Sequence, residues 1–157
     1  MGGNGSYSKE WGGVPEVSRT HIDTGFRIDG HKVLLLENNP SHDKIIMNSN
    51  SENPIYLFAA VDKKSGKVTI SGIGIYEKHA IKESIDLKFD SQGNVIPFSN
   101  SENGSHSHLW YEISPGIYGR RRHDKSNYFA IDNKYQPLIN KIIDFNKKGK
   151  IWKKDTV

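Results

Sequence analysis

The sequence predicts a single α+β domain, in which an antiparallel sheet of about five strands packs against one amphipathic helix at the C-terminal end. Three observations predict this class. Residues 54–98 contain short β-prone segments separated by turn residues. Residues 132–148 carry apolar side chains at helical spacing. A chain of 157 residues is long enough for one domain with a buried core and too short for two ordinary ones.

Residues 1–30 are predicted to form a flexible Gly/Ser-rich extension that precedes a single domain over residues 31–157. Glycine and proline interrupt every apolar period in this segment, and most of its other residues are polar. Trp11 and Phe26 are isolated aromatic residues, so we expect them to pin the extension to the domain. The Met-Gly-Gly start is also typical of the cut edge of a longer polypeptide.

The first strand is expected over residues 32–36. This apolar run follows Asp29-Gly30 and precedes an Asn-Asn-Pro sequence, which are both turn signals. A short helix is expected over residues 42–47, because Asn39 can cap it and Pro40 suits a first helical position.

Residues 54–98 are expected to form a meander. Residues 54–61 and 67–76 are β-prone and flank a Ser-Gly turn, which predicts an antiparallel hairpin. Residues 84–90 alternate apolar and polar side chains, so one face of this strand would be buried. Turn residues then lead into a strand over residues 95–98.

Two further strands and the helix complete the domain. Residues 108–113 and 117–121 are predicted strands with a Ser-Pro-Gly turn between them, which would make them neighbours in the sheet. The helix is expected over residues 132–148. Pro137 suits its first turn, and Gly149 suits its end.

Composition limits the classes of function. The formal net charge is +4 and the pI is near 9.2, so an anionic partner such as nucleic acid is favoured. The chain has no cysteine, so any metal would need His, Asp or Glu ligands. No apolar run is long enough to cross a membrane and no signal-sequence pattern is present, which predicts a soluble protein. The motifs of P-loop enzymes and α/β-hydrolases are also absent.

Two motifs hold most of the reactive side chains. His106 and His108 lie in a Gly-Ser-His-Ser-His-Leu-Trp-Tyr segment, and residues 119–125 read Gly-Arg-Arg-Arg-His-Asp-Lys. Imidazoles exchange protons near neutral pH and guanidinium groups bind phosphate oxygens, so these motifs together predict a phosphodiester site. RNA cleavage would use His106 or His108 as the general base and His123 as the general acid. This chemistry requires no metal and no other cofactor.

The basic and aromatic residues around the histidines are expected to bind the substrate. Arg121 would stabilise the charge that develops on the phosphate during catalysis. Aromatic side chains stack on unpaired bases, and basic side chains bind the backbone of a nucleic acid. The residues expected to bind nucleic acid are Arg120, Arg122, Lys125, Trp110 and Tyr118.

Two alternative interpretations remain open. His106 and His108 would share one face of an extended strand, and with His123 they would supply three imidazole ligands for zinc. The chain would then be a His-ligated, metal-dependent hydrolase. The basic segment could instead be a solvated turn and the aromatic residues could pack within the sheet, which would leave a non-catalytic binding module.

Four segments resemble domains at the C-terminal ends of phage and prophage head-morphogenesis (minor capsid) proteins. They are the start Gly-Ser-Tyr-Ser-Lys-Glu-Trp-Gly-Gly-Val-Pro, the motif His-Ser-His-Leu-Trp, the segment Gly-Arg-Arg-Arg-His-Asp-Lys-Ser-Asn and the closing helix Tyr-Gln-Pro-Leu-Ile-Asn-Lys-Ile-Ile-Asp-Phe-Asn-Lys. Such ends often carry toxin-like domains, some of them similar to the barnase, EndoU, colicin and RelE group of metal-independent ribonucleases. The resemblance implies helices packed on an antiparallel sheet. It also implies activity at His106, His108, Arg121 and His123, although those enzymes share few exact residues.

We therefore expect a phage-associated, nuclease-like toxin or effector domain that cleaves RNA by metal-independent acid–base catalysis. Its partners would be RNA or another phosphate-bearing ligand, together with a phage capsid or host protein, and no membrane. The expected location is the host cytoplasm or the virion. The alternatives are a non-catalytic structural or nucleic-acid-binding module and the metal-dependent hydrolase.

Overall fold

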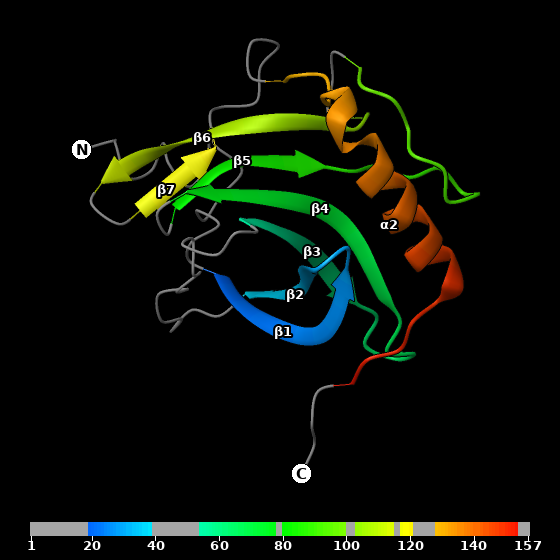
Figure 1. The fold of residues 1–157 in the computed structure, drawn as a ribbon. Coiled ribbons are helices and arrows are strands. Elements are labelled where there is room, and N and C mark those ends of the chain that lie inside the picture. Colours follow the sequence, from blue (N-terminus) through cyan, green and yellow to red (C-terminus); the bar gives the residue numbers. More distant parts are fainter. Residues whose placement is uncertain are drawn as a thin grey trace.

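The computed structural model describes residues 19–38, 54–77, 80–99, 103–114, 117–120 and 128–153. Its strands form one curved sheet, and its C-terminal helix lies against one side of that sheet (Figure 1). The strands are β1 (Arg19–Ile28), β2 (His31–Asn38), β3 (Ile55–Val61), β4 (Val68–Glu77), β5 (Ala80–Asp86), β6 (His106–Ser114) and β7 (Ile117–Arg120). The helices are the short 3-10 helix η3 (Asn133–Tyr135) and α2 (Gln136–Lys148).

The strands lie in the sheet in the order of the chain, from β1 to β7. Neighbouring strands run antiparallel, except β2 and β3, which run parallel. The predicted α+β class is confirmed, and the sheet has seven strands where about five were expected. The helix expected over residues 42–47 lies outside the described residues.

β1 occupies part of the segment that was expected to be a flexible extension, residues 1–30. The even-numbered residues from Ile22 to Ile28 are buried or half-buried, and the odd-numbered ones between them are exposed. This period of two is typical of a half-buried strand, and the polar composition of the segment conceals it. Asp29 and Gly30, with φ values of 54° and 81°, form the tight turn into β2. Residues 19–28 are therefore part of the sheet.

The last part of the predicted meander, residues 84–98, differs from the structure. β5 ends at Asp86, where a strand over residues 84–90 was expected, and the described residues 95–98 form no strand. Asp90 turns the chain, because its carboxylate accepts hydrogen bonds from the backbone N–H groups of two following residues. The alternation of side chains therefore continues beyond the point where the strand ends.

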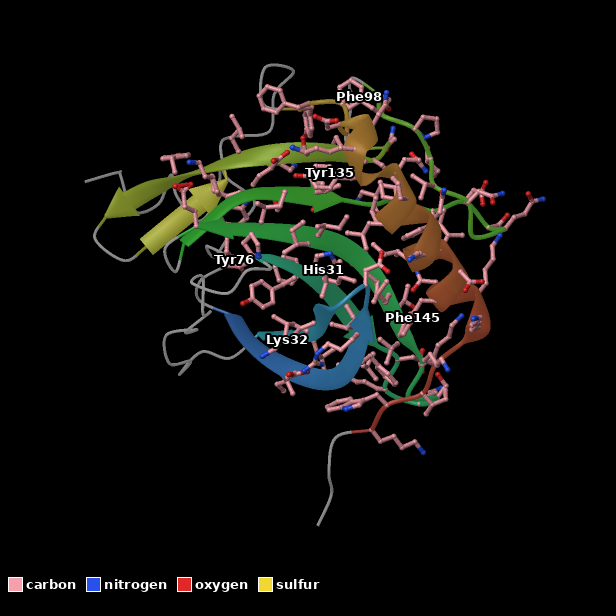
Figure 2. All side chains as sticks on the ribbon, viewed as in Figure 1. His31, Lys32, Tyr76, Phe98, Tyr135 and Phe145 are labelled. Atoms are coloured by element: carbon pink, nitrogen blue, oxygen red, sulfur yellow. The ribbon has the colours of Figure 1, made fainter. Side chains whose placement is uncertain are left out.

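The sheet has a separate apolar cluster on each face. On one face, which is mostly aliphatic, Ile139, Ile142 and Phe145 of α2 pack against the strands. Phe145 also meets Phe26 of β1 edge-on, with 5.6 Å between ring centroids, so the strand at the edge of the sheet reaches the helix. Figure 2 shows Phe145 on this side and Tyr76 away from α2. The opposite face carries Leu34, Tyr56, Phe58, Tyr76, Ile81 and Trp110.

α2 has the ends that its sequence predicts. Pro137 lies in its first turn, and Gly149 ends it with a left-handed φ of 68°. The side-chain amide of Asn146 accepts a hydrogen bond from the N–H of Ile70 at 2.8 Å and donates one to its carbonyl at 3.0 Å. This pair of bonds fixes the helix to β4 beside a bulge in that strand. No helix in the described part of the chain is long and apolar enough to cross a membrane.

Candidate functional site

β6 directs both histidines of the His-Ser-His motif to the sheet face opposite α2. Side chains alternate along a strand, so His106 and His108 share a face with Trp110, which belongs to the cluster there. The register with β5 sets Asp86 opposite His106 and Ser84 opposite His108. Directly opposed residues of paired strands point to the same face. Asp86 therefore lies beside the two histidines.

We call Asp86, His106 and His108 the trio. The Nε2 atoms of the two histidines are 2.9 Å apart. Oδ2 of Asp86 lies 3.5 Å from Nε2 of His108 and 3.8 Å from Nε2 of His106. One potential ligand atom from each residue lies within 4.8 Å of the other two. Two imidazole nitrogens and one carboxylate oxygen therefore converge on the same small volume.

A backbone carbonyl orients the ring of His106. Its Nδ1 lies 2.6 Å from the carbonyl oxygen of Gly104, and because a carbonyl oxygen only accepts, this nitrogen donates. In the neutral ring, Nε2 then carries a lone pair and accepts a hydrogen bond from Nε2 of His108. The lone pair of His106 is thus directed at the other two members of the trio.

Gly104 occupies a position that admits no side chain. A Cβ atom there would clash with the carbonyl oxygen of Pro97. The neighbouring Ser105 is fixed as well, since its hydroxyl oxygen accepts a hydrogen bond from the N–H of Lys88 at 2.8 Å. Its own N–H donates to the carbonyl of Ile96 at 2.9 Å. The loop after β5 therefore holds the Gly104 carbonyl against His106.

The trio is buried at its histidines and open at its carboxylate. His106 is 2% exposed and His108 0%, whereas the side chain of Asp86 is 32% exposed. Burial has the largest effect on His106 and lowers its pKa below the ordinary value for histidine, although the hydrogen bond to Gly104 acts in the opposite direction. His106 is therefore neutral at pH 7, and its Nε2 lone pair is free of a proton.

An aromatic ring closes the trio on the edge of β6 away from β5. Phe129 and Ser107 exchange backbone hydrogen bonds of 2.8 and 3.2 Å, so the chain rejoins the sheet beside the start of β6. This pairing brings the ring centroid of Tyr128 to 4.5 Å from that of His106 and 5.3 Å from that of His108. Tyr128 is itself buried, and its ring excludes water from this side of the imidazoles.

β7 brings the start of the arginine-rich segment to the same edge of β6. Arg120 pairs with Trp110 and Tyr118 pairs with Glu112, which confirms the predicted neighbouring strands. The side chains of Arg120 and Tyr118 are outside what the structure describes. The other predicted site residues of this segment lie wholly outside the described residues: Arg121, Arg122, His123 and Lys125.

Trp110 has a position in the core. It is 9% exposed, and its indole N–H donates to the hydroxyl oxygen of Ser84 at 2.7 Å. Its ring packs with the aromatic cluster on the face opposite α2. A nucleobase could stack on it only after those side chains moved, so this position favours packing over the predicted nucleic-acid contact.

Asp86 is the member of the trio that sequence reasoning missed. Its alternation with Ile85 and Leu87 indicates that its carboxylate points away from the aliphatic face. Its partner on β6 cannot be deduced in the same way, because the long connection between β5 and β6 leaves the register of the two strands open. A shift of one residue would have sent the histidines to the other face.

The trio can perform two kinds of chemistry. Hydrogen-bonded imidazoles beside a carboxylate can transfer protons in general acid–base catalysis. The same nitrogen and oxygen atoms can also coordinate a divalent transition-metal ion.

No protein-family model, curated protein or solved structure matches this chain.

Proposed function

We propose that this chain is a phosphodiester-cleaving, nuclease-like domain whose reaction centre is the trio. The observation that carries the proposal is the 2.9 Å contact between the Nε2 atoms of His106 and His108, with the Asp86 carboxylate beside it. The pair has one nitrogen that accepts a proton and one that donates, and the nearby carboxylate stabilises the charged form when a proton is added. Such a pair suits the transfer of protons to and from a reacting phosphodiester.

The residues next to the outer edge of β6 are an argument for a phosphate-bearing substrate such as RNA. Residues 121–127 begin after Arg120 and end before Tyr128, and both of these flanking residues lie on the edge of β6 beside the trio. Guanidinium groups bind phosphate oxygens in a bidentate manner, and the chain as a whole carries a net charge of +4. In this proposal Arg121 binds the reacting phosphate and His123 supplies the second proton-transfer group.

Because Asp86 is the partly exposed member of the trio, we expect substrate to approach from its side. The two imidazoles are buried, and Tyr128 covers the side away from β5. Protons therefore exchange with solvent or substrate past the carboxylate. In this proposal the reacting phosphodiester reaches the trio from the open side, past Asp86.

We infer the phage context from the sequence resemblance alone. In this inference the chain is a toxin-like domain at the end of a head-morphogenesis protein, and it acts in the host cytoplasm or is carried by the virion. A mostly antiparallel sheet with a C-terminal helix is compatible with the architecture that the resemblance implies.

Cleavage of total RNA by the purified chain tests the proposed activity, over a range of pH and both with a chelator and with added divalent metal. The wild type should cleave, and His106→Ala or His108→Ala should reduce the rate by about 100-fold or more. His31→Ala is a matched control, because His31 shares a strand face with Val33 of the α2-side cluster. Absence of cleavage under every condition would contradict the proposal.

A second candidate is a non-catalytic module that binds nucleic acid or a phage or host protein. The burial of both imidazoles favours it, as do two large apolar side chains, Leu109 and Phe129, which are 45% and 40% exposed. Phe129 pairs with Ser107, so these two side chains lie near each other on the face opposite the trio. Salt-dependent RNA binding without cleavage would support this candidate in its nucleic-acid form.

A further inference from the structure

The trio brings three potential metal ligands to one point. The Nε2 atoms of His106 and His108 and Oδ2 of Asp86 all face the same volume. In the metal-free chain the Nε2–H of His108 points into this volume and donates to Nε2 of His106. A divalent cation would displace this one proton and bind all three atoms.

The ring of His106 has the orientation that metal-binding histidines adopt. Its Nδ1 donates to the Gly104 carbonyl at 2.6 Å, which leaves Nε2 as the free donor of an electron pair. Metal-ligating histidines almost always donate their other ring N–H to a carbonyl, a carboxylate or water, because that bond fixes both the tautomer and the direction of the lone pair. Gly104 is in turn fixed by the close approach of Pro97.

The distances within the trio fit a tetrahedral ion after a small adjustment. Ligand atoms about 2.0–2.2 Å from zinc lie about 3.3–3.6 Å from one another at tetrahedral angles. The three distances in the trio are 2.9, 3.5 and 3.8 Å, which bracket this value. The imidazoles would separate by a few tenths of an ångström, since an ion would replace the hydrogen bond that now draws them together.

We propose that Asp86, His106 and His108 bind one divalent transition-metal ion of the zinc type through two imidazole nitrogens and one carboxylate oxygen. The fourth position faces the exposed side of Asp86, where water or a substrate oxygen can enter. This set differs from the three-histidine set that the sequence suggested, because the carboxylate of β5 takes the place assigned there to His123. The inference goes beyond the proposed function and does not depend on it, since binding needs no substrate.

Titration of the chelator-treated wild-type chain with Co²⁺ tests the site directly. We expect a visible absorption band that saturates at about one ion per chain and disappears when Zn²⁺ displaces the Co²⁺. His31→Ala, on the other face of the sheet, should bind with unchanged affinity. No metal-dependent absorption in the wild type, together with no heat of Zn²⁺ binding, would overturn the proposal.

Asp86→Asn separates a ligand role from a structural one. This change keeps the shape of the side chain and removes its negative charge, so the fold should persist, as the melting temperature of the metal-free variant would show. Co²⁺ affinity should fall at least tenfold in Asp86→Asn and further in His108→Ala. A wild-type affinity in Asp86→Asn would overturn the assigned ligand set even if His108→Ala failed to fold.

Metal analysis of chain purified without chelator identifies the ion. Zinc bound to the wild type and missing from Asp86→Asn supports the assignment, whereas manganese or iron as the bound ion would overturn the zinc type. The RNA assay remains independent of these results. Co²⁺ binding without RNA cleavage would support the metal site and contradict the proposed nuclease activity. Cleavage in chelator by a chain that binds no Co²⁺ would support the nuclease activity and contradict the metal site.

Discussion

The two faces of the sheet are built from different chemistry. The face under α2 is mostly aliphatic, and the helix packs against it. The opposite face is aromatic, with Tyr76 edge-on to Tyr56 at 5.4 Å and to Phe58 at 6.4 Å, and it continues into the trio. Polar groups on this second face bond to one another, as the indole of Trp110 does to Ser84.

The packing that stabilises the fold is concentrated on the α2 face, whereas the candidate site lies on the opposite face of the same sheet. A single strand contributes to both faces, since Ile85 points into the aliphatic cluster while Asp86 joins the trio. Changes on the α2 face should therefore alter the free energy of unfolding with little effect on the site. Changes on the opposite face should affect both.

Ile142→Ala tests the α2 face and should have the largest effect on stability. Ile142 is fully buried, so the substitution removes packing contacts and leaves a cavity, at a cost of about 2–5 kcal/mol. Urea denaturation measures the loss, with the exposed substitution Asn140→Ala as a control that should change stability by less than about 0.5 kcal/mol. Co²⁺ affinity of the folded variant should stay at the wild-type value. A large fall in that affinity would show that the two faces are coupled.

Gly74→Ala tests the aromatic face. A Cβ at this position would overlap the ring of Phe58, so the variant should lose about 2–3 kcal/mol of stability. Gly74 pairs with Ser84, which pairs with His108, so Co²⁺ affinity should fall as well. In a Phe58→Leu background the added methyl group has more room and should cost less. Equal costs in both backgrounds would mean that the ring is not the obstacle.

Asn146→Ala examines the polar contact on the otherwise aliphatic face. The substitution leaves the N–H and carbonyl of Ile70 without the side chain that bonds both, and it should cost about 1–2 kcal/mol. Hydrogen exchange of the Ile70 amide should accelerate more than that of amides on β6. Uniform acceleration throughout the sheet would indicate global destabilisation without a local role for the contact.

Asp90→Asn should have the smallest effect and concerns the loop that supports Gly104. Hydrogen bonds from backbone N–H groups, that of Asn94 first, lower the pKa of Asp90 below its ordinary value of 3.8. A lowered folded-state pKa gives stability that is present above the ordinary value and lost as pH falls through the folded-state value. The wild type should therefore lose more stability than Asp90→Asn between pH 5 and the acid range. Parallel urea curves for the two proteins at each pH would contradict this.

The sequence predicts the fold through local patterns and loses predictive power where distant segments meet. Residues 132–148 carry a helical period with proline and glycine at the ends, and α2 follows it closely. β1 was missed because glycine and polar residues conceal a period of two that becomes plain only when the strand is paired. Strand order could be guessed for hairpins, whereas the parallel pairing of β2 with β3 has no local signal.

The candidate site shows the same limit. The His-Ser-His spacing correctly predicted that two imidazoles share a strand face. Asp86 was recognised as a polar residue of its strand, but its membership of the trio depends on the register between β5 and β6. Trp110 was predicted to bind nucleic acid because of its basic neighbours. Its burial depends on the pairing of β2 to β6, which no short motif encodes.

Two described segments pair with the outer edge of β6, β7 along its second half and Phe129 at Ser107. If β7 continued in register, residue 123 would face Ser107, but Phe129 takes that place. Between these two pairings the chain is therefore six residues longer than a continuous register requires, and both ends of this stretch lie beside the trio. A change in the sequence or length of this stretch would alter the chemistry joined to the trio while the described strand register and core stay the same.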